Sequence, residues 1–280
     1  MALVWRKQQK ETLFEVRSAG KSMRLYTNGV FHSQYNPLQP VSGGIWDLLL
    51  LPVFFYPDNQ LKRILVLGVG GGAVLRQLNH FAGPDIIVGV ELNPVHINIA
   101  KRFFGIRRYL PQSTALTKIR QSKAEHNTAN KKNNIRNKTR IELYQADAIE
   151  WMNNYRGPPF DVIIDDLFSD SDGEPQRAVS ANSVWASRLL SHLSPGGLLT
   201  INFVSRAESR ASAFFHKKYL QKQITSAFEF SSPRYENVIL ALTGTESSRE
   251  VLKKNLSRFR ELDPRRKSSR LQFRVSQITV

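Results

Sequence analysis

Apolar and polar positions follow two alternating patterns through the middle of the chain. Short apolar runs predict buried strands at 64–67, 86–90, 141–144, 161–164 and 198–204. Between them, apolar residues at helical spacing predict helices after Gly72 and at 94–104, 148–155, 181–193 and 209–228. A final strand at 236–243 is expected to pair antiparallel with its neighbour. Strands that alternate with helices predict an α/β fold with a mostly parallel sheet, covered on both faces.

The two ends of the chain follow other patterns. Residues 1–60 contain short strand-like runs at 13–16, 23–26 and 30–33, broken by Gly20 and by Asn28-Gly29, which is a strong hairpin signal. An apolar helix is expected at 44–51, and one basic helix at 247–262 before a polar end. We therefore divide the chain into a small β-rich region (1–60), an α/β domain (61–246) and a basic C-terminal helix and tail (247–280).

Residues 112–140 interrupt the α/β pattern. They are rich in Asn, Lys, Gln and Thr and have almost no apolar content after Ile119. Such a composition does not bury enough apolar surface to order itself, so we predict a disordered basic insertion.

Most of the positive charge lies in two segments. The net charge is +17, of which 107–140 contributes +9 (ten Lys/Arg, one acid) and 249–280 contributes +7 (ten Lys/Arg, three acids). Weak polyanion binding through 112–140 and 249–274 is one expectation. Charge that only aids solubility is the other, because the insertion lacks aromatic side chains for base stacking.

Several classes of protein are disfavoured by the composition. There are no cysteines, which excludes disulfides, thiolate catalysis and cysteine-ligated metals. The first ten residues lack the apolar core of a secretory signal, and the longest apolar run, 48–56, is broken by Pro52. That run is far shorter than the roughly 20 residues of a membrane helix. We expect a soluble, cytoplasmic protein without membrane contact, and we see no metal-ligand spacing.

A glycine-rich turn follows the first strand of the α/β domain, with glycines at 68, 70, 71 and 72. Glycine permits a sharp turn and the close approach of a ligand, and the following helix presents free N–H groups. Gly68, Gly70 and Ala73 also satisfy the dinucleotide pattern G-x-G-x-x-G/A. The turn therefore predicts a nucleotide-type cofactor but does not indicate which class of cofactor binds. A tight turn that binds no ligand is the alternative interpretation.

Acidic residues end the next three strands, where ligands bind in such sheets. Glu91 ends the second strand, 19 residues after Gly72, and suits ribose hydroxyls. Asp147, followed by Ala148, ends the third and suits an adenine amino group. The fourth strand ends in Asp165 and Asp166, with Asp170 in the loop beyond. The third-strand acid and the antiparallel last strand favour an adenosyl-sulfonium cofactor over a nicotinamide dinucleotide.

Several segments together resemble one family. They are LYTNGVFHS (25–33), RILVLGVGGG (63–72), GVELNP (89–94), FFG (103–105), YQADA (144–148), FDVIIDDLFSDSDGEP (160–175) and LSPGGLLTINF (193–203). The chain resembles the spermidine synthase-like (polyamine aminopropyltransferase-like) group of the S-adenosylmethionine-dependent methyltransferase superfamily. This resemblance implies a Rossmann-like class I methyltransferase sheet after a small N-terminal β-hairpin region. Related enzymes often form dimers, so it also implies a homodimer.

The resemblance also implies site residues. Glycines 68 and 70–72, with Ala148, would cradle S-adenosylmethionine or its decarboxylated form. Glu91 would hold the ribose and Asp147 the adenine. Asp166 would lie beside the transfer site as the base or orienting acid, with Asp165 and Asp170 as weaker candidates. His32 either lines the acceptor side or is structural.

The chain departs from the family on the amine side of the site. The Asp of the family's Gly-Gly-Gly-Asp-Gly run is Ala73 here, and Tyr-His-Glu on the preceding helix corresponds to Ile45, Trp46 and Asp47. The Asp-Ser-x-Asp-Pro loop lacks its proline, and its second Asp is displaced by one. A diamine needs carboxylates at fixed separation for its two ammonium groups. The cofactor half of the site is therefore expected to be intact and the amine half altered.

Three functions follow from these observations. The first is methyl transfer from S-adenosylmethionine to an unknown acceptor. The second is aminopropyl transfer from the decarboxylated donor, with an altered amine pocket. The third is a polyanion- or RNA-binding protein with a vestigial cofactor fold.

Overall fold

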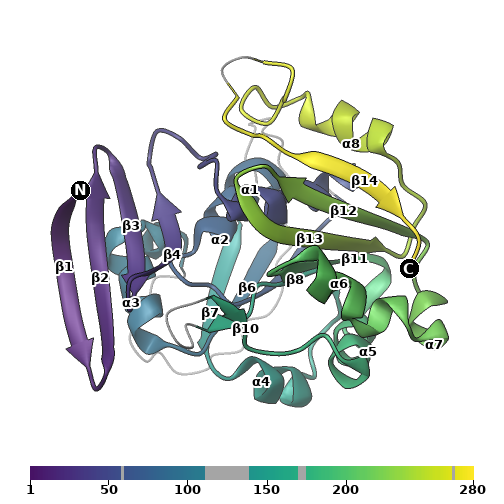
Figure 1. The fold of residues 1–280 in the computed structure, drawn as a ribbon, viewed down its shortest axis with the longest axis horizontal. Helices are drawn as coiled ribbons and strands as arrows, with labels where there is room; N and C mark the ends of the chain where they lie inside the picture. The colour runs from purple at the N-terminus through teal and green to yellow at the C-terminus, as the bar shows by residue number, and fades with distance from the viewer. Residues whose placement is uncertain (58–59, 111–138, 170–174, 267–268) are drawn as a thin grey trace, which may run out of the picture.

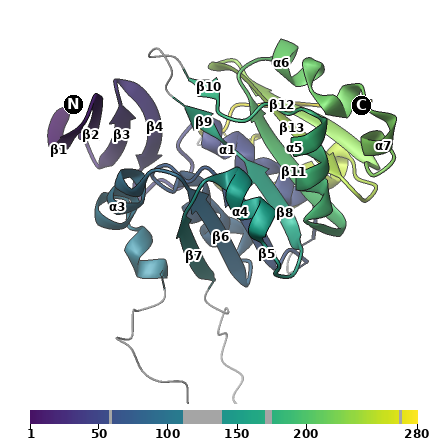
Figure 2. The same ribbon diagram turned by 90° about the horizontal axis from the view of Figure 1, so that it is seen from below.

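The computed structural model describes residues 1–57, 60–110, 139–169, 175–266 and 269–280. An N-terminal antiparallel sheet stands beside a larger mixed sheet in both views (Figure 1, Figure 2). A two-stranded ribbon of β9 (Phe168–Ser169) and β10 (Gln176–Arg177) completes the described strands. The predicted α/β class, with its N-terminal β-rich region, is confirmed.

The N-terminal sheet has four strands in sequence order: β1 (Ala2–Gln9), β2 (Thr12–Ala19), β3 (Ser22–Thr27) and β4 (Val30–Tyr35). The predicted Asn28-Gly29 turn joins β3 to β4. The inward residues Phe14, Val16 and Leu25 pack against the helix that follows β6. Strand β1 was not predicted, because seven of its eight residues are exposed and its apolar positions form no pattern.

The central sheet has eight strands in the order β14-β12-β13-β11-β8-β5-β6-β7. They are β5 (Arg63–Leu67), β6 (Ile86–Glu91), β7 (Arg140–Gln145), β8 (Phe160–Asp165), β11 (Leu193–Phe203), β12 (Ser226–Ser232), β13 (Tyr235–Thr243) and β14 (Arg274–Ile278). Pairing is parallel from β11 through β8, β5 and β6 to β7, and antiparallel from β11 to β13, β12 and β14. The mostly parallel sheet and the antiparallel partner of β11 were both predicted.

Two apolar layers cover the faces of this sheet. Along β5, Ile64 and Val66 face one cluster while Leu65 and Leu67 face the other, because successive strand residues point to opposite sides. Helices α1 (Ile45–Leu50), α2 (Ala73–Gln77) and α8 (Arg249–Leu256) pack on the first side. Helices α4 (Ala148–Asn154) and α5 (Ser183–Ser191) pack on the second. Helix α3 (Pro94–Phe103) faces the N-terminal sheet.

Shorter helical segments complete the described helices. They are η1 (Leu51–Phe55), η2 (Leu78–Ala82), η3 (Ile106–Tyr109), α6 (Arg206–Ala211), η5 (Ala213–Phe215) and α7 (Lys218–Gln221).

The prediction of a single helix at 209–228 is wrong. The chain instead forms α6, η5 and α7 and then enters strand β12. Helix α6 ends because Ser212 is extended (ψ 156°), and the apolar residues Ala227, Phe228 and Phe230 are buried in a strand. Short apolar runs fit either period, so spacing alone does not separate these alternatives.

The tail also differs from expectation. Its helix, α8, covers only Arg249–Leu256, and the expected polar end contains β14, which pairs with β12. The predicted disordered insertion at 112–140 lies outside the described residues, except for Thr139 and Arg140. Among the described helices, none combines the length and apolarity needed to cross a membrane.

Candidate functional site

A cavity of about 800 Å³ opens at the carboxyl ends of β5, β6, β7 and β8. The glycine turn, the loops after these strands and the β3–β4 hairpin of the N-terminal sheet line it. We call it the donor cavity. Its lining includes the sequence-predicted residues Gly68, Gly70, Glu91, Asp147, Ala148, Asp166 and His32.

Gly68 brings the glycine turn against the end of β8. Its φ is +83°, and a Cβ built there would lie 2.1 Å from the backbone oxygen of Asp166. The Gly68 N–H donates to Val90 O and the Asp166 N–H donates to Leu67 O, both at 2.9 Å. Because no other residue fits this contact, glycine is what allows the turn and Asp166 to share one wall.

Gly71 and Gly72 do not line the donor cavity. A Cβ on Gly71 would lie 2.7 Å from the Ser33 side chain, and one on Gly72 would lie 2.8 Å from Ile106. These two glycines therefore allow close packing of the N-terminal sheet and of η3 against the turn. Of the four predicted cradle glycines, only Gly68 and Gly70 face the cavity.

Glu91 is buried and binds the glycine turn. Its Oε2 accepts from the N–H groups of Val69 (3.0 Å) and Gly70 (2.8 Å), and its Oε1 accepts from Asn93 N–H (2.9 Å). His96 Nδ1 lies 3.5 Å from the same Oε1. Burial alone would raise the pKa of Glu91, but hydrogen bonding and the charge of His96, with the backbone hydrogen bonds, outweigh it and hold the pKa below its usual value. The carboxylate is therefore ionised at neutral pH.

Thr27 and His96 were missed in the sequence. His96 Nε2 lies 2.9 Å from Thr27 Oγ1, so the two side chains connect Glu91 to the N-terminal sheet. The His96 ring lies edge-on to Phe14 and 5.2 Å from the His32 ring, between centroids. Both Thr27 and His96 line the donor cavity. One histidine on a helix carries no spacing signal, which is why sequence reasoning did not find it.

Asp147 caps the N-terminus of helix α4 and lines the donor cavity. Its Oδ1 accepts from the N–H groups of Ile149 (2.8 Å) and Glu150 (3.0 Å), as an N-cap residue does. This cap fixes the carboxylate at the cavity edge beside the buried Ala148. An adenine contact at Asp147 stays a prediction.

Asp166 lies in the donor cavity with an amide chain behind it. Asn202 Nδ2 donates to Asp166 Oδ1 (2.8 Å), and Asn237 Nδ2 donates to Asn202 Oδ1 (3.1 Å). Burial raises the pKa of Asp166 to about 6, against the lowering effect of the Asn202 hydrogen bond. The two asparagines were missed, although each is a polar residue within an otherwise apolar strand.

Asp165, by contrast, is fully buried outside the cavity lining. Its Oδ2 accepts from Arg177 (2.8 Å) and from Trp185 Nε1 (2.9 Å). Successive strand residues point to opposite faces, so Asp165 turns toward α5 when Asp166 turns toward the cavity. Asp165 is thus placed to anchor β10 and α5. The third candidate, Asp170, lies outside the described residues.

The structure also locates the residues at the positions where the resemblance implied amine-binding side chains. Ile45 and Trp46 line the donor cavity, whereas Ala73 is buried in the core. Asp47 does not line it: its carboxylate accepts from Ser42 N–H, Ser42 Oγ, Gly43 N–H and Gln77. Burial raises the pKa of Asp47 despite these hydrogen bonds.

Comparison with known proteins gives one sequence relative and several similar folds. No family model matches the chain. Polyamine aminopropyltransferase 2 of Caldanaerobacter subterraneus subsp. tengcongensis is 29% identical over 171 residues, which is 61% of this chain and 46% of that protein. The match therefore spans less than half the length of this curated relative.

Solved structures extend the similarity over most of the chain. Spermidine synthase from Thermotoga maritima matches with a TM-score of 0.61 and 13% identity, over 93% of this chain and 79% of that one. Human methyltransferase-like protein 13, solved with SAH, matches with a TM-score of 0.50 and 16% identity, over 80% of this chain and 96% of that one. The chain therefore has a spermidine synthase-like fold.

Proposed function

We propose that this chain is a transferase that binds an adenosyl-sulfonium donor in the donor cavity. We further propose that it passes a methyl group from S-adenosylmethionine to an acceptor nucleophile. The observation that carries the proposal is the contact between the glycine turn and Asp166. Gly68 lies against the Asp166 backbone, while Glu91 holds the same turn through Val69 and Gly70. Donor-binding and acceptor-activating groups therefore share one cavity.

The side chains in the donor cavity suit a positively charged adenosyl donor. Its lining holds three carboxylates, Glu91, Asp147 and Asp166, and no Lys or Arg among the described residues. The volume, about 800 Å³, is within the range of small-molecule sites. Glu91 would hold the ribose hydroxyls and Asp147 the adenine amino group. The open backbone at Gly68 and Gly70 leaves room for the nucleoside.

The chain's own residues supply alignment and a proton acceptor. When bound, the donor provides a carbon activated by positive sulfur: the acceptor–carbon bond forms as the carbon–sulfur bond breaks, leaving a neutral thioether. Asp166 Oδ1 already accepts from Asn202, so Oδ2 would take the proton of the acceptor nucleophile. Asn237 fixes Asn202, which fixes the carboxylate. The cavity thus orients the reactants and removes one proton.

Aminopropyl transfer is the second candidate reaction. It is favoured by the sequence similarity to polyamine aminopropyltransferase 2. The same donor cavity suits the decarboxylated donor. Ile45 and Trp46 weigh against it, because they offer an apolar wall where a diamine needs carboxylates.

The products distinguish the two reactions. Purified protein would be incubated with pooled amines, alcohols and acids and with either donor, and the nucleoside product would be identified by mass spectrometry. Methyl transfer yields S-adenosylhomocysteine, and aminopropyl transfer yields methylthioadenosine. We expect the first, at a rate that Asp166→Asn lowers. Methylthioadenosine formed from the decarboxylated donor, with no S-adenosylhomocysteine, would reject methyl transfer.

A further inference from the structure

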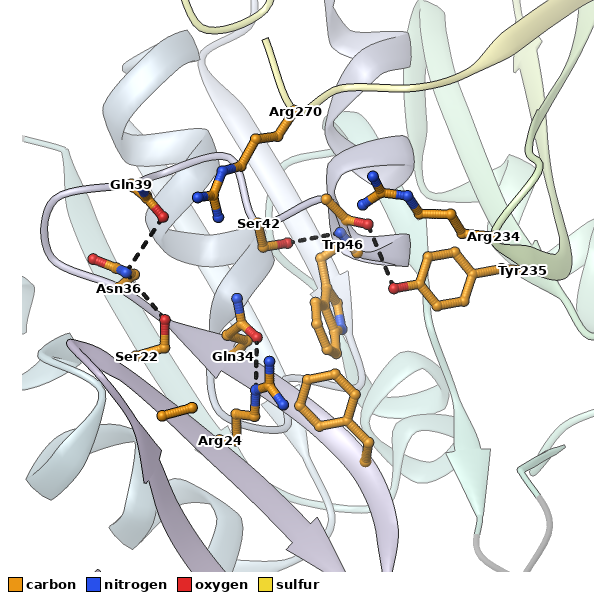
Figure 3. Close-up of a pocket in the computed structure, with 14 residues that line it drawn as sticks. Ser22, Arg24, Gln34, Asn36, Gln39, Ser42, Trp46, Arg234, Tyr235 and Arg270 are labelled. Carbon is orange, nitrogen blue, oxygen red and sulfur yellow. Dashed lines mark hydrogen bonds between the residues drawn. The ribbon is translucent and has the colours of Figure 1, made fainter. Parts of the chain in front are cut away.

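A second cavity of about 490 Å³ shares lining residues with the donor cavity. Figure 3 shows the side chains that line it. It lies between the N-terminal sheet, the loop before α1, the β12–β13 turn and the segment before β14. Three arginines line it, each from a different element: Arg24 from β3, Arg234 from the β12–β13 turn and Arg270 from the C-terminal segment. We call it the arginine cavity.

Among the described residues, no carboxylate lines the arginine cavity. Within the described residues, none of the three arginines forms an ion pair. Arg24 Nε donates to the neutral amide oxygen of Gln34 (3.0 Å), and its guanidinium lies over the Phe31 ring at 5.7 Å. In Figure 3, Arg24 and Arg270 extend toward one another from opposite sides of the cavity. Three guanidinium groups in one concave site form a binding surface for a carboxylate or a phosphate.

The nearby acid, Asp47, does not fill this role. Its carboxylate accepts from the N–H groups of Ser42 and Gly43 and from Ser42 Oγ, and it is absent from the cavity lining. These bonds fold the loop before α1 so that Ser42 and Gly43 face the cavity. The Arg234 guanidinium approaches Gly43 so closely that a Cβ there would lie 2.8 Å from its nitrogen. Asp47 thus shapes the cavity without lining it, and in the part of the chain that the structure describes it forms no ion pair with the three arginines.

The two cavities share a wall of three aromatic residues: Phe31, Trp46 and Tyr235. Phe31 and Trp46 pack edge to face with centroids 5.2 Å apart. The Tyr235 hydroxyl donates to Gly43 O at 3.4 Å. A molecule long enough to span these three side chains would have its anionic end at the arginines and its other end in the donor cavity with Asp166.

We infer that the arginine cavity binds the carboxylate or phosphate of an anionic acceptor whose nucleophile enters the donor cavity. The anion site stands on the three arginines, whereas its assignment to the acceptor rests on the proposed function. A polyamine is the opposite case, because its ammonium groups would be repelled by three guanidinium groups without a carboxylate between them. The apolar Ile45 and Trp46 in the neighbouring wall agree with this reading.

The anion site is tested by calorimetric titration with three probes: inorganic phosphate, benzoate and benzylamine. Benzoate and benzylamine have similar shape and opposite charge. We expect phosphate and benzoate to bind and benzylamine not to bind. Arg24→Gln and Arg234→Gln should each weaken benzoate binding by about tenfold or more, since each removes a charge-assisted contact. Arg6→Gln is the matched control, because Arg6 is exposed on β1 and outside both cavities.

Three results would each overturn the anion site. The first is benzylamine binding as tightly as benzoate. The second is unchanged benzoate affinity in both arginine variants, and the third is an equal loss of benzoate affinity in Arg6→Gln. Thermal midpoints of all variants would be compared, so that a folding defect is recognised. Donor binding is measured separately, so absence of donor binding in the wild type would reject the proposed function while leaving the anion titration interpretable.

The source of the anion is tested with two nucleosides. S-adenosylmethionine carries a carboxylate and methylthioadenosine does not. If the anionic group that binds the arginines belongs to the acceptor, Arg24→Gln and Arg234→Gln bind both nucleosides as tightly as the wild type does. If these variants lose affinity for S-adenosylmethionine alone, the arginines bind the donor's own carboxylate, and the acceptor assignment is overturned.

Discussion

At the residue scale, Asp165 and Asp166 are adjacent in the chain and experience opposite environments. Asp165 is enclosed with a cation, Arg177, and an indole N–H, whereas Asp166 faces the donor cavity with an amide from Asn202. A carboxylate that is paired with a buried cation and has no access to a ligand stabilises the fold. A carboxylate in a cavity with a raised pKa is a candidate for proton transfer.

The raised pKa of Asp166 predicts a pH dependence. As a base it must be ionised, so kcat/KM should rise as the pH increases through about 6 and level off above it. Asp166→Asn should lower kcat/KM at pH 8 by about 100-fold or more and remove this inflection. The control is Asp85→Asn, because Asp85 is exposed and outside the donor cavity. An Asp166→Asn variant that keeps the wild-type pH profile would contradict the role of Asp166.

Arg177 provides a second prediction at this scale. Its side chain is 2% exposed, and it donates to Asp165, to Asn202 O and to Val179 O. Arg177→Met would leave a buried carboxylate without its cation, so we expect the free energy of unfolding at pH 7 to fall by about 3 kcal/mol. Denaturant unfolding measures this. The double variant Asp165→Asn/Arg177→Met should recover part of the loss, and no recovery would indicate that packing of Arg177 dominates.

At the element scale, the N-terminal sheet is joined to the glycine turn by close contacts. Gly71 lies against Ser33 of β4, and Arg76 of α2 donates to Gly71 O (2.8 Å), Phe104 O (3.1 Å) and Gln34 O (2.8 Å). The hairpin that covers the donor cavity is therefore held by the same turn that lines it.

Gly71→Ala tests this contact. The added methyl group would meet the Ser33 side chain at 2.7 Å and Phe104 at 3.0 Å, so we expect a loss of about 1–3 kcal/mol in the free energy of unfolding. Ser33→Gly in the same background should restore part of that stability, because it removes two of the three clashing atoms. If the double variant loses stability by the sum of the two single losses, the side chains at positions 71 and 33 do not clash.

Continuous apolar runs gave the clearest strand predictions in the central sheet. β5, β6 and β8 are buried on both faces, so their apolar residues are consecutive. β14 was missed because only Val275 and Ile278 of its five residues are partly covered. Helical spacing wrongly placed the first three residues of β12, 226–228, in a helix.

The residues of the candidate site also fall into a group that sequence position indicated and a group that it did not. Glu91 and Asp147 end predicted strands, so position indicated them. Thr27, His96, Asn202 and Asn237 converge only after folding. Strand alternation separates Asp165 from Asp166, but it does not tell which of them meets the cavity.

At the scale of the whole molecule, charge is unevenly distributed. The donor cavity has carboxylates, the arginine cavity has cations, and the largest basic segment, 107–140, lies mostly outside the described residues. Replacing 112–138 by a short Gly-Ser linker should therefore preserve donor affinity within about twofold. It should also lower the salt concentration at which the protein elutes from heparin, because phosphate-like contacts are lost with each cation. Unchanged elution would remove this segment as a polyanion-binding site.

Donor binding tests the central claim most directly. S-adenosylmethionine, its decarboxylated form and methylthioadenosine would be titrated calorimetrically into wild type, Glu91→Ala and Glu142→Ala, a control on β7 outside the donor cavity. We predict that wild type and Glu142→Ala bind at least one donor. Glu91→Ala should lose about tenfold or more in donor affinity, because it removes the proposed ribose acceptor and the anchor of the glycine turn. Wild type that binds none of the three, or Glu91→Ala that binds as tightly as wild type, would contradict the account.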